Sequence, residues 1–271
     1  MITAANNKKV KNLVNLIQKA KIRREQDVFI TEGIKMFLEA PMDRIKEVYV
    51  SESFYEKENA REKLEQCQYE VLSDEVFKKV SDTQTPQGIL CVMKQFHYEL
   101  KDMFQKENPM FLILEDIQDP GNLGTMVRTA EGAGVDGIIM TKGTVDIYNP
   151  KTIRSTMGSV YRMPFFYTED LLGVMKQLQE RKVTLYAAHL KGNQYYHQLD
   201  FKGAAAFLIG NEGNGLKEET AGAADVYMKI PMAGKVESLN AAVASVILMY
   251  EAARQRSHNE EIQRIFESGS E

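Results

Sequence analysis

From residue 109 onward, short apolar segments alternate with segments of helical spacing, and this alternation is the feature that most constrains the fold. The apolar segments read FLILED, DGIIM, VTLYAAHL, AAAFLIG and VYMKIPM. The helical segments begin with GNLGTM, PKTIRS, TEDLLG and SLNAAV. Strands that alternate with helices predict a mostly parallel sheet covered on both faces, so we expect an α/β protein. In such sheets, ligands bind beyond the carboxyl ends of the strands.

Glycine content and one polar segment divide the chain into two predicted domains. Of the 18 glycines, Gly33 and Gly88 precede residue 100 and the other 16 follow it. The segment KQFHYELKDMFQKENP is rich in acids and bases and is typical of a linker. The segments DVFIT, EVYVS and GILCVM, which precede residue 95, indicate a small α/β unit. We therefore expect a small domain over residues 1–95, a linker over 96–108 and a larger domain over 109–271.

Composition excludes several classes of protein. The chain has 271 residues, of which 44% are hydrophobic and 27% charged, as in an ordinary globular protein. No apolar run approaches the roughly 20 residues of a membrane span, so we expect a cytoplasmic protein that does not bind membranes. Cys67 and Cys91 are far apart in the sequence and are expected to be reduced and inert. Histidine and cysteine show no metal-ligand spacing, so we expect no metal.

The first 24 residues are basic, although the net charge of the whole chain is −4. They contain no acid and seven basic residues: Lys8, Lys9, Lys11, Lys19, Lys21, Arg23 and Arg24. Such a segment lowers the cost of approaching phosphates. It is equally typical of the solvated face of a helix, and charge alone does not decide between these two interpretations.

Two glycine patterns resemble nucleotide-binding motifs but lack the required context. The stretch GNEGNGL, Gly210–Leu216, has the glycine spacing of a Walker loop, with leucine where that motif needs lysine. Gly132, Gly134 and Gly137 form GxGxxG, yet they lie between a helix and a strand, the reverse of the order in a dinucleotide site. We therefore expect neither a nucleoside triphosphatase nor a nicotinamide-dependent oxidoreductase.

Two other stretches combine the start of a helix with polar side chains. Asn122 and Arg128 lie in or beside the first turns of the helix in IQDPGNLGTMVRTAEGAG, where free N–H groups and the arginine favour an anion such as phosphate. A helix cap plus a surface arginine is the alternative. In the stretch ESLNAAVASVILMYEAARQ, Ser238 is the expected N-cap. Apolar residues then recur at helical spacing, as in a stripe that faces the core: Leu239, Val243, Val246, Ile247 and Tyr250.

Three motifs, taken in order along the chain, are similar to those of a known family. NLGTMVRTAEG, IGNEGNGL and IPMAGKVESLNAAVASVILMYE resemble the signatures of the SpoU/TrmH family of RNA ribose 2′-O-methyltransferases, within the SPOUT superfamily. VFITEGIKMFLEA resembles the start of that family's RNA-binding domain, and NPKTIRSTMGSVYRMP resembles its inter-motif segment. The resemblance covers nearly the whole chain.

The resemblance implies a fold and a cofactor. The fold is a C-terminal SPOUT-type α/β domain with a deep trefoil knot, plus a small N-terminal α/β RNA-binding domain, in a homodimer. The cofactor is S-adenosylmethionine, and glycines would let backbone groups approach it without a Cβ in the way. The implied cofactor-binding residues are Leu208, Ile209, Gly210, Asn211, Gly215, Ile230, Met232, Ser238 and Leu239, among which the side chains of Ile209, Ile230, Met232 and Leu239 suit a flat purine.

The resemblance also implies a catalytic site in which Arg128 assists the attack of a ribose 2′-hydroxyl on the methyl group. Arginine is effectively always protonated, so two roles stay open. Arg128 either loses its proton in the bound site and acts as the base, or it binds a neighbouring phosphate and steadies the developing alkoxide. The other implied catalytic residues are Asn122, Glu212, Ser238 and Asn240.

The implied substrate is folded RNA, bound mainly through phosphates and shape. The predicted RNA-binding residues are Lys8, Lys9, Lys11, Arg23, Arg24, Arg128 and Arg154. The two-domain layout resembles ribosomal RNA enzymes more than transfer RNA enzymes, so we expect 23S ribosomal RNA as the substrate. A transfer RNA 2′-O-methyltransferase and a non-catalytic RNA-binding member of the fold are the alternatives.

Overall fold

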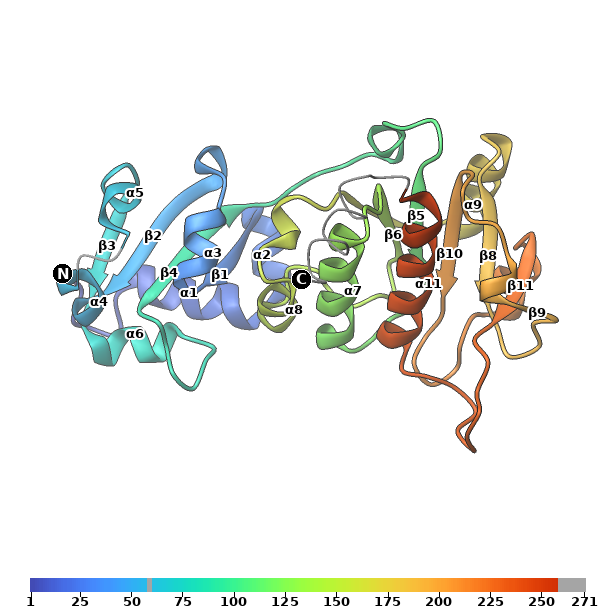
Figure 1. Cartoon of the computed structure of the whole chain (residues 1–271). Coiled ribbons are helices and arrows are strands. Elements are labelled where there is room, and N and C mark those ends of the chain that lie inside the picture. The colour runs from blue at the N-terminus through green and yellow to red at the C-terminus, as the bar shows by residue number, and fades with distance from the viewer. Residues whose placement is uncertain (58–59, 258–271) are drawn as a thin grey trace, which may run out of the picture. The chain divides into compact units, whose positions relative to one another are not determined.

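The computed structural model describes residues 1–57 and 60–257, which form two compact units (Figure 1). The first unit contains Met1–His97, Asp119–Arg128 and Val145–Arg162. The second contains Tyr98–Gln118, Thr129–Thr144 and the described residues from Met163 onward. Residues 258–271, which belong to the larger predicted domain, lie outside the described residues.

A four-stranded sheet with the strand order β1-β4-β2-β3 forms the first unit. Its strands are β1 (Val28–Glu32), β2 (Ile45–Ser51), β3 (Tyr69–Leu72) and β4 (Ile89–Lys94). Strand β4 is antiparallel to β1 and β2, whereas β2 and β3 are parallel. The helices of this unit are α1 (Lys8–Gln18), α2 (Ala20–Gln26), α3 (Ile34–Glu39), α4 (Glu52–Glu56), α5 (Arg61–Glu65), α6 (Asp74–Val80) and α8 (Pro150–Thr156).

Helices α1 and α6 contribute the apolar core on one side of this sheet. Val10, Leu13 and Leu16 recur every three residues along α1 and are at most 1% exposed. They pack in one cluster with Val76 and Phe77 of α6. The basic residues of α1 therefore lie on a helix whose opposite face is fixed in the core.

A seven-stranded parallel sheet with the order β7-β6-β5-β10-β8-β11-β9 forms the second unit. Its strands are β5 (Met110–Leu114), β6 (Gly137–Thr141), β7 (Phe165–Thr168), β8 (Thr184–Ala188), β9 (Gln194–Tyr195), β10 (Ala205–Ile209) and β11 (Val226–Lys229). Every pairing between them is parallel, which confirms the predicted α/β class. The helices are α9 (Leu171–Glu180), α10 (Glu218–Gly222) and α11 (Ala241–Arg256), and α7 (Pro120–Gly132) contains residues of both units.

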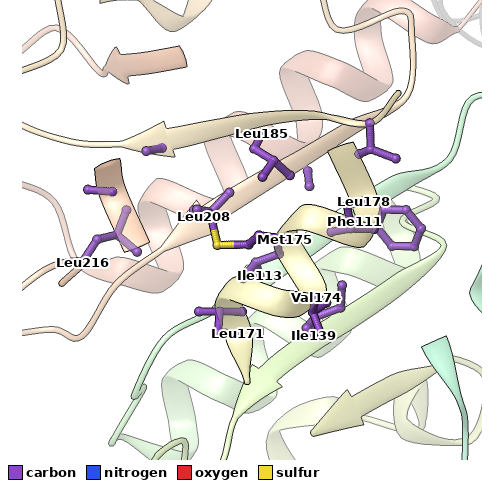
Figure 2. Close-up of a cluster of buried hydrophobic side chains, with 14 of the residues drawn as sticks. Phe111, Ile113, Ile139, Leu171, Val174, Met175, Leu178, Leu185, Leu208 and Leu216 are labelled. Atoms are coloured by element: carbon purple, nitrogen blue, oxygen red, sulfur yellow. The ribbon is translucent and has the colours of Figure 1, made fainter. Parts of the chain in front are cut away.

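Helix α9 covers part of the second sheet. Figure 2 shows Met175 and Leu178 of this helix lying against Ile113, Leu185 and Leu208 of three strands. All five side chains are fully buried. Burial of an aliphatic side chain of this size stabilises a fold by about 1.5–3 kcal/mol, so this cluster fixes the sheet from which the site loops extend.

Helix α11 departs from the prediction in two respects. It begins at Ala241, and Asn240 is its N-cap, so the prediction that Ser238 caps this helix was wrong. Its buried face consists of Ala241, Ala242, Ser245, Leu248, Met249 and Ala252. Val243 and Tyr250 are 47% and 51% exposed, so the predicted core stripe was also wrong. Small residues face the core because α11 packs closely against β10.

Strand register places the ends of β5 and β10 beside each other. Leu114 pairs with Ile209, and each is the last residue of its strand. Glu115 and Gly210 therefore follow at the same edge of the sheet. Parallel strands end on the same side, so the chain leaving β11 also starts at this carboxyl edge.

Candidate active site

The segment 210–217, which leaves β10, forms a tight loop. The backbone N–H of Asn211 donates to the carbonyl of Gly215 over 3.0 Å, and the N–H of Gly215 donates back to Asn211 over 2.9 Å. Gly215 has a φ of +70°, a left-handed conformation that favours glycine. At Gly210, a Cβ would lie 2.1 Å from the carbonyl carbon of Gly215 and the nitrogen of Leu216. Both glycines are therefore required by the shape of this loop.

The same loop is tied to the end of β5. The side-chain amide of Asn211 donates to the Asp116 carbonyl over 2.8 Å, and its Oδ1 accepts from the N–H groups of Gly213 and Asn214. The carboxylate of Glu212 accepts from the backbone N–H of Gln118 over 3.1 Å. The structure thus brings the predicted residues Asn211 and Glu212 to the carboxyl end of β5.

The segment that leaves β11 is arranged differently. In Figure 1 it is the orange-red loop between β11 and α11, which extends beyond the strands of the sheet. Residues 231–239 form no hydrogen bond with any part of the chain that the structure describes. The backbone N–H and C=O groups of this loop are consequently available to a ligand.

Partly exposed apolar side chains accompany these open backbone groups. Ile230, Met232 and Leu239 are half-buried, whereas Ser238 is exposed. Ile209, which the sequence placed in the same purine-binding set, is only 3% exposed, and its carbonyl accepts from the Glu115 N–H. Half-buried aliphatic side chains beside free backbone donors and acceptors fit the adenosine part of S-adenosylmethionine, which needs a flat apolar contact and hydrogen bonds to its base edge.

Asn240 ends this open loop and begins α11. Its side-chain oxygen accepts from the N–H of Ala242 over 2.9 Å and from that of Val243 over 3.3 Å. This is an N-cap interaction, typically worth about 1 kcal/mol. The Asn240 side chain, for which a catalytic role was predicted, therefore also caps α11.

Asn122 and Arg128 lie on α7, in the part that belongs to the first unit. The guanidinium of Arg128 is exposed and forms no hydrogen bond or ion pair with any residue that the structure describes. The backbone N–H of Asn122 donates to Asp119 Oδ1 over 2.8 Å, and this bond lowers the pKa of Asp119. A Cβ at Gly124 would lie 2.4 Å from the Ser155 Cβ, so α7 and α8 approach closely in this unit.

Apart from Arg128, the predicted RNA-binding residues fall into three groups: exposed cations, cations paired with an acid, and one buried arginine. Lys8, Lys11 and Arg24 are exposed on α1 and α2. Lys9 is also exposed, but its ammonium is 2.7 Å from Glu70, and the guanidinium of Arg154 is paired with Asp82. Lys8, Lys11 and Arg24 form no ion pair with any described residue, whereas Lys9 and Arg154 would exchange an acidic partner for a phosphate on binding RNA.

Arg23 has a structural role instead. It is 2% exposed, and its guanidinium lies 2.6 Å from Asp146 Oδ2. It also donates to the backbone carbonyls of Leu16 and Ile17, over 2.8 and 3.1 Å. The prediction that Arg23 binds RNA is contradicted, because its donors already have partners in the core.

Among the residues that the structure describes, no group of three or more His, Cys, Asp or Glu side chains is placed to hold a metal ion. None of the helices in this part of the chain combines the length and apolar character needed to cross a bilayer.

The two acids that hold the loop 210–217 were not singled out from the sequence. Glu115 and Asp116 directly follow the buried strand β5, and both accept hydrogen bonds at the carboxyl edge. The signal was present in the segment FLILED, in which two carboxylates end an apolar run. Acids at that place in a parallel sheet lie where ligand loops begin.

Two family models match different parts of the chain. A model described as the SpoU rRNA Methylase family matches residues 109–250, and one described as the MRM3-like substrate binding domain matches residues 7–91. The 23S rRNA (guanosine(2553)-2′-O)-methyltransferase RlmP of Bacillus subtilis (strain 168) is 33% identical over 251 residues, which is 92% of this chain and 97% of the relative.

Solved structures are similar over the same extent. The AdoMet-bound rRNA methyltransferase from Sinorhizobium meliloti has a TM-score of 0.80 and 33% identity, and the match covers 93% of this chain and 97% of that chain. The SpoU methyltransferase AviRb from Streptomyces viridochromogenes, in complex with AdoMet, has a TM-score of 0.85 over 94% of this chain and 100% of that chain. At 24% identity, the second match shows likeness of fold alone.

Proposed function

Because the chain belongs to the SpoU rRNA methylase family, we propose that it transfers a methyl group from S-adenosylmethionine to a ribose 2′-hydroxyl of 23S ribosomal RNA. The observation that carries this proposal is the 33% identity to RlmP over 92% of the chain, which includes both the substrate-binding and the methylase regions. Since ribosomal RNA is the proposed substrate, we place the activity in the cytoplasm.

The two loops at the carboxyl edge of the second sheet are the proposed cofactor site. The backbone of Gly210, Asn211 and Gly215 forms one part, with Leu208 and Ile209 behind it in β10. Ile230, Met232, Ser238 and Leu239 form the other part, with the unbonded backbone of residues 231–239. When bound, S-adenosylmethionine supplies an electrophilic methyl group on a sulfonium, which is a good leaving group and needs no acid.

We assign Arg128 the task of stabilising negative charge. An arginine with no partner in the described chain keeps its donors for an RNA phosphate or for the oxygen that loses its proton during attack. Alignment of the attacking hydroxyl can lower the barrier by up to about 7–11 kcal/mol, so positioning is the larger task of the site. Asn122, Glu212, Ser238 and Asn240 are the other proposed catalytic residues.

The proposed domain division follows the sequence: residues 1–95 bind RNA, 96–108 link, and 109–271 catalyse. Family models matching 7–91 and 109–250 support it. Lys8, Lys9, Lys11, Arg24 and Arg154 are the proposed phosphate contacts of the chain besides Arg128. Membership of the family also supports the proposed deep trefoil knot in the catalytic domain.

A homodimer is the proposed assembly. Val243 and Tyr250 are exposed at one face of α11, and Val246 and Ile247 between them are half-buried. These residues recur at i, i+3, i+4 and i+7 on one helix, which is the spacing of a packed helix face. A partly exposed apolar helix face of this kind is typical of a surface that binds another protein chain. We propose that it binds a second copy of this chain.

The experiment that tests the function measures transfer of labelled methyl groups to purified 23S ribosomal RNA and to transfer RNA, followed by mapping of 2′-O-methyl marks. We expect one mark in 23S ribosomal RNA. Arg128→Ala should lose methyl transfer and keep cofactor binding, because its side chain has no partner in the described fold. Transfer to transfer RNA alone would reassign the substrate, and turnover by the variant would remove Arg128 from the mechanism.

A further inference from the structure

Glu115, the first residue after β5, is a buried carboxylate that the proposed chemistry does not use. It is 2% exposed. Its Oε2 accepts from the backbone N–H of Lys217 over 2.8 Å, and its Oε1 accepts from the hydroxyl of Thr220 over 2.5 Å. Its own backbone N–H donates to the carbonyl of Ile209 over 2.9 Å. Each carboxylate oxygen therefore has a donor, as a buried charge requires.

These bonds hold both ends of the loop 210–217. Ile209 is the residue before the loop, and Lys217 is its last residue and precedes α10. Glu115, at the carboxyl end of β5, thus fixes both the start of the loop, where it leaves β10, and its end, where it enters α10. Between these points, the loop contains the glycines that shape the proposed cofactor site.

A second carboxylate supports the same arrangement. The ammonium of Lys217 lies 2.8 Å from Asp116 Oδ2 and 3.9 Å from Glu115 Oε1. Asp116 in turn accepts from the Thr141 hydroxyl at the end of β6, over 2.7 Å. Asp116 has a φ of 55°, a conformation that non-glycine residues adopt only where neighbouring contacts hold them. The loop is therefore fastened to β5 and, through Asp116, to β6.

We propose that Glu115 is a positioning residue for the methyl transfer, holding the loop 210–217 in the shape that receives the cofactor. This inference rests on the proposed function. Glu115 is not a base for the reaction, because both of its oxygens accept protein donors and its side chain is buried. It acts through the backbone of the loop, without contact to the reacting atoms.

Two substitutions separate this role from a general effect of charge. Glu115→Ala leaves the partly buried Lys217 N–H and the buried Thr220 hydroxyl without their acceptor. Glu115→Gln keeps the first bond and replaces the second by one of opposite direction, because its amide oxygen accepts from the Lys217 N–H and its NH₂ donates to the Thr220 hydroxyl oxygen. The alanine variant should therefore loosen the loop, and the glutamine variant should restore it.

The test uses hydrogen exchange of the cofactor-free protein together with titration of S-adenosylmethionine and of RNA. In Glu115→Ala, we expect amides of residues 211–217 to exchange about tenfold faster and cofactor affinity to fall about tenfold, with RNA affinity unchanged. Glu115→Gln should stay within about threefold of the wild type in all three measurements. An alanine variant with wild-type exchange in this loop, or a glutamine variant as impaired as alanine, would overturn the inference.

Thr220→Val replaces Glu115→Ala if the alanine variant does not fold. The valine variant removes one of the two donors to Glu115 with little change of shape, so amides of the loop should still exchange faster than in the wild type. Wild-type exchange in Thr220→Val would also overturn the inference. If the wild-type protein does not bind S-adenosylmethionine, the proposed function fails, whereas exchange in the cofactor-free protein still decides whether Glu115 holds the loop.

Discussion

The two loops proposed to hold the cofactor differ in how the protein holds them. The loop 210–217 has hydrogen bonds within itself and to Glu115, Asp116 and Gln118. The loop 231–239 has none with the rest of the described chain. One loop is formed before any ligand arrives, and the other has backbone groups left for a ligand to engage.

This difference predicts how binding free energy is distributed. A preformed loop costs little ordering entropy when it binds, whereas an unbonded loop loses conformational freedom as it is fixed. The first loop should therefore set the geometry of the site, and the second should follow the cofactor. Substitutions in the first should act through shape, and substitutions in the second through contact area.

Gly210→Ala should have the largest effect. The new Cβ would lie 2.1 Å from backbone atoms of Gly215 and Leu216, so the loop cannot keep its shape. We expect cofactor affinity, measured by calorimetry, to fall by about a hundredfold. Gly213→Ala is the matched control, because its Cβ would meet only Asn211 Oδ1 at 3.5 Å and should leave affinity near that of the wild type. Equal affinities for the two variants would mean that the preformed shape does not matter.

Leu239→Ala should have a smaller effect of a different kind. Leu239 is half-buried in the unbonded part of the chain, and removal of its methyl groups takes away apolar contact with the cofactor. About half of the full transfer free energy gives roughly a tenfold loss of affinity with an unchanged unfolding temperature of the cofactor-free protein. Val236→Ala serves as the control in the same loop, since Val236 is 62% exposed. A drop in unfolding temperature would show that Leu239 supports the fold rather than the ligand.

Asn240 follows the unbonded loop, and two substitutions distinguish its role as the N-cap of α11 from its proposed catalytic role. Asn240→Ala should lower the free energy of unfolding by about 1 kcal/mol, because the N–H groups of Ala242 and Val243 lose their acceptor. Asn240→Asp should keep the cap and so keep stability, which denaturant titration measures. If the aspartate variant also keeps full methyl transfer, the amide of Asn240 has no catalytic task beyond its acceptor oxygen.

The loops also show what the sequence could and could not predict. Gly210 and Gly215 could be singled out from the sequence because IGNEGNGL resembles a family signature, and the structure shows a close backbone approach at Gly210 and a positive φ at Gly215. The role of Arg23 was not, because its partner Asp146 is distant in the sequence and a basic segment gives no sign of which cation is buried. The buried face of α11 was missed for a similar reason: packing against β10 selects alanine and serine, which a search for large apolar residues passes over.

The smallest expected effect concerns Lys217, the last residue of the preformed loop. Its ammonium holds the pKa of Asp116 below the ordinary 3.8, and Asp116 raises the pKa of Lys217 above 10.5. The carboxylate therefore adds stability above about pH 3.8 that is lost as pH falls through its folded-state pKa, and the ammonium adds stability below about pH 10.5 that is lost as pH rises through its own. Because the Lys217 side chain is 55% exposed, solvent screening limits the cost of Lys217→Met to about 0.5 kcal/mol near pH 7.

That cost should disappear in acid, when denaturant titrations of the two proteins are compared at a pH below the folded-state pKa of Asp116, which itself lies below 3.8. Lys202→Met is a suitable control, since Lys202 is exposed and forms no ion pair with any described residue. A cost that persists unchanged in acid would assign the effect of Lys217 to packing of its aliphatic stem. In that case the preformed loop would be held by the hydrogen bonds from the Lys217 N–H to the Glu115 carboxylate and from Asn211 to the Asp116 carbonyl, rather than by the charge of Lys217.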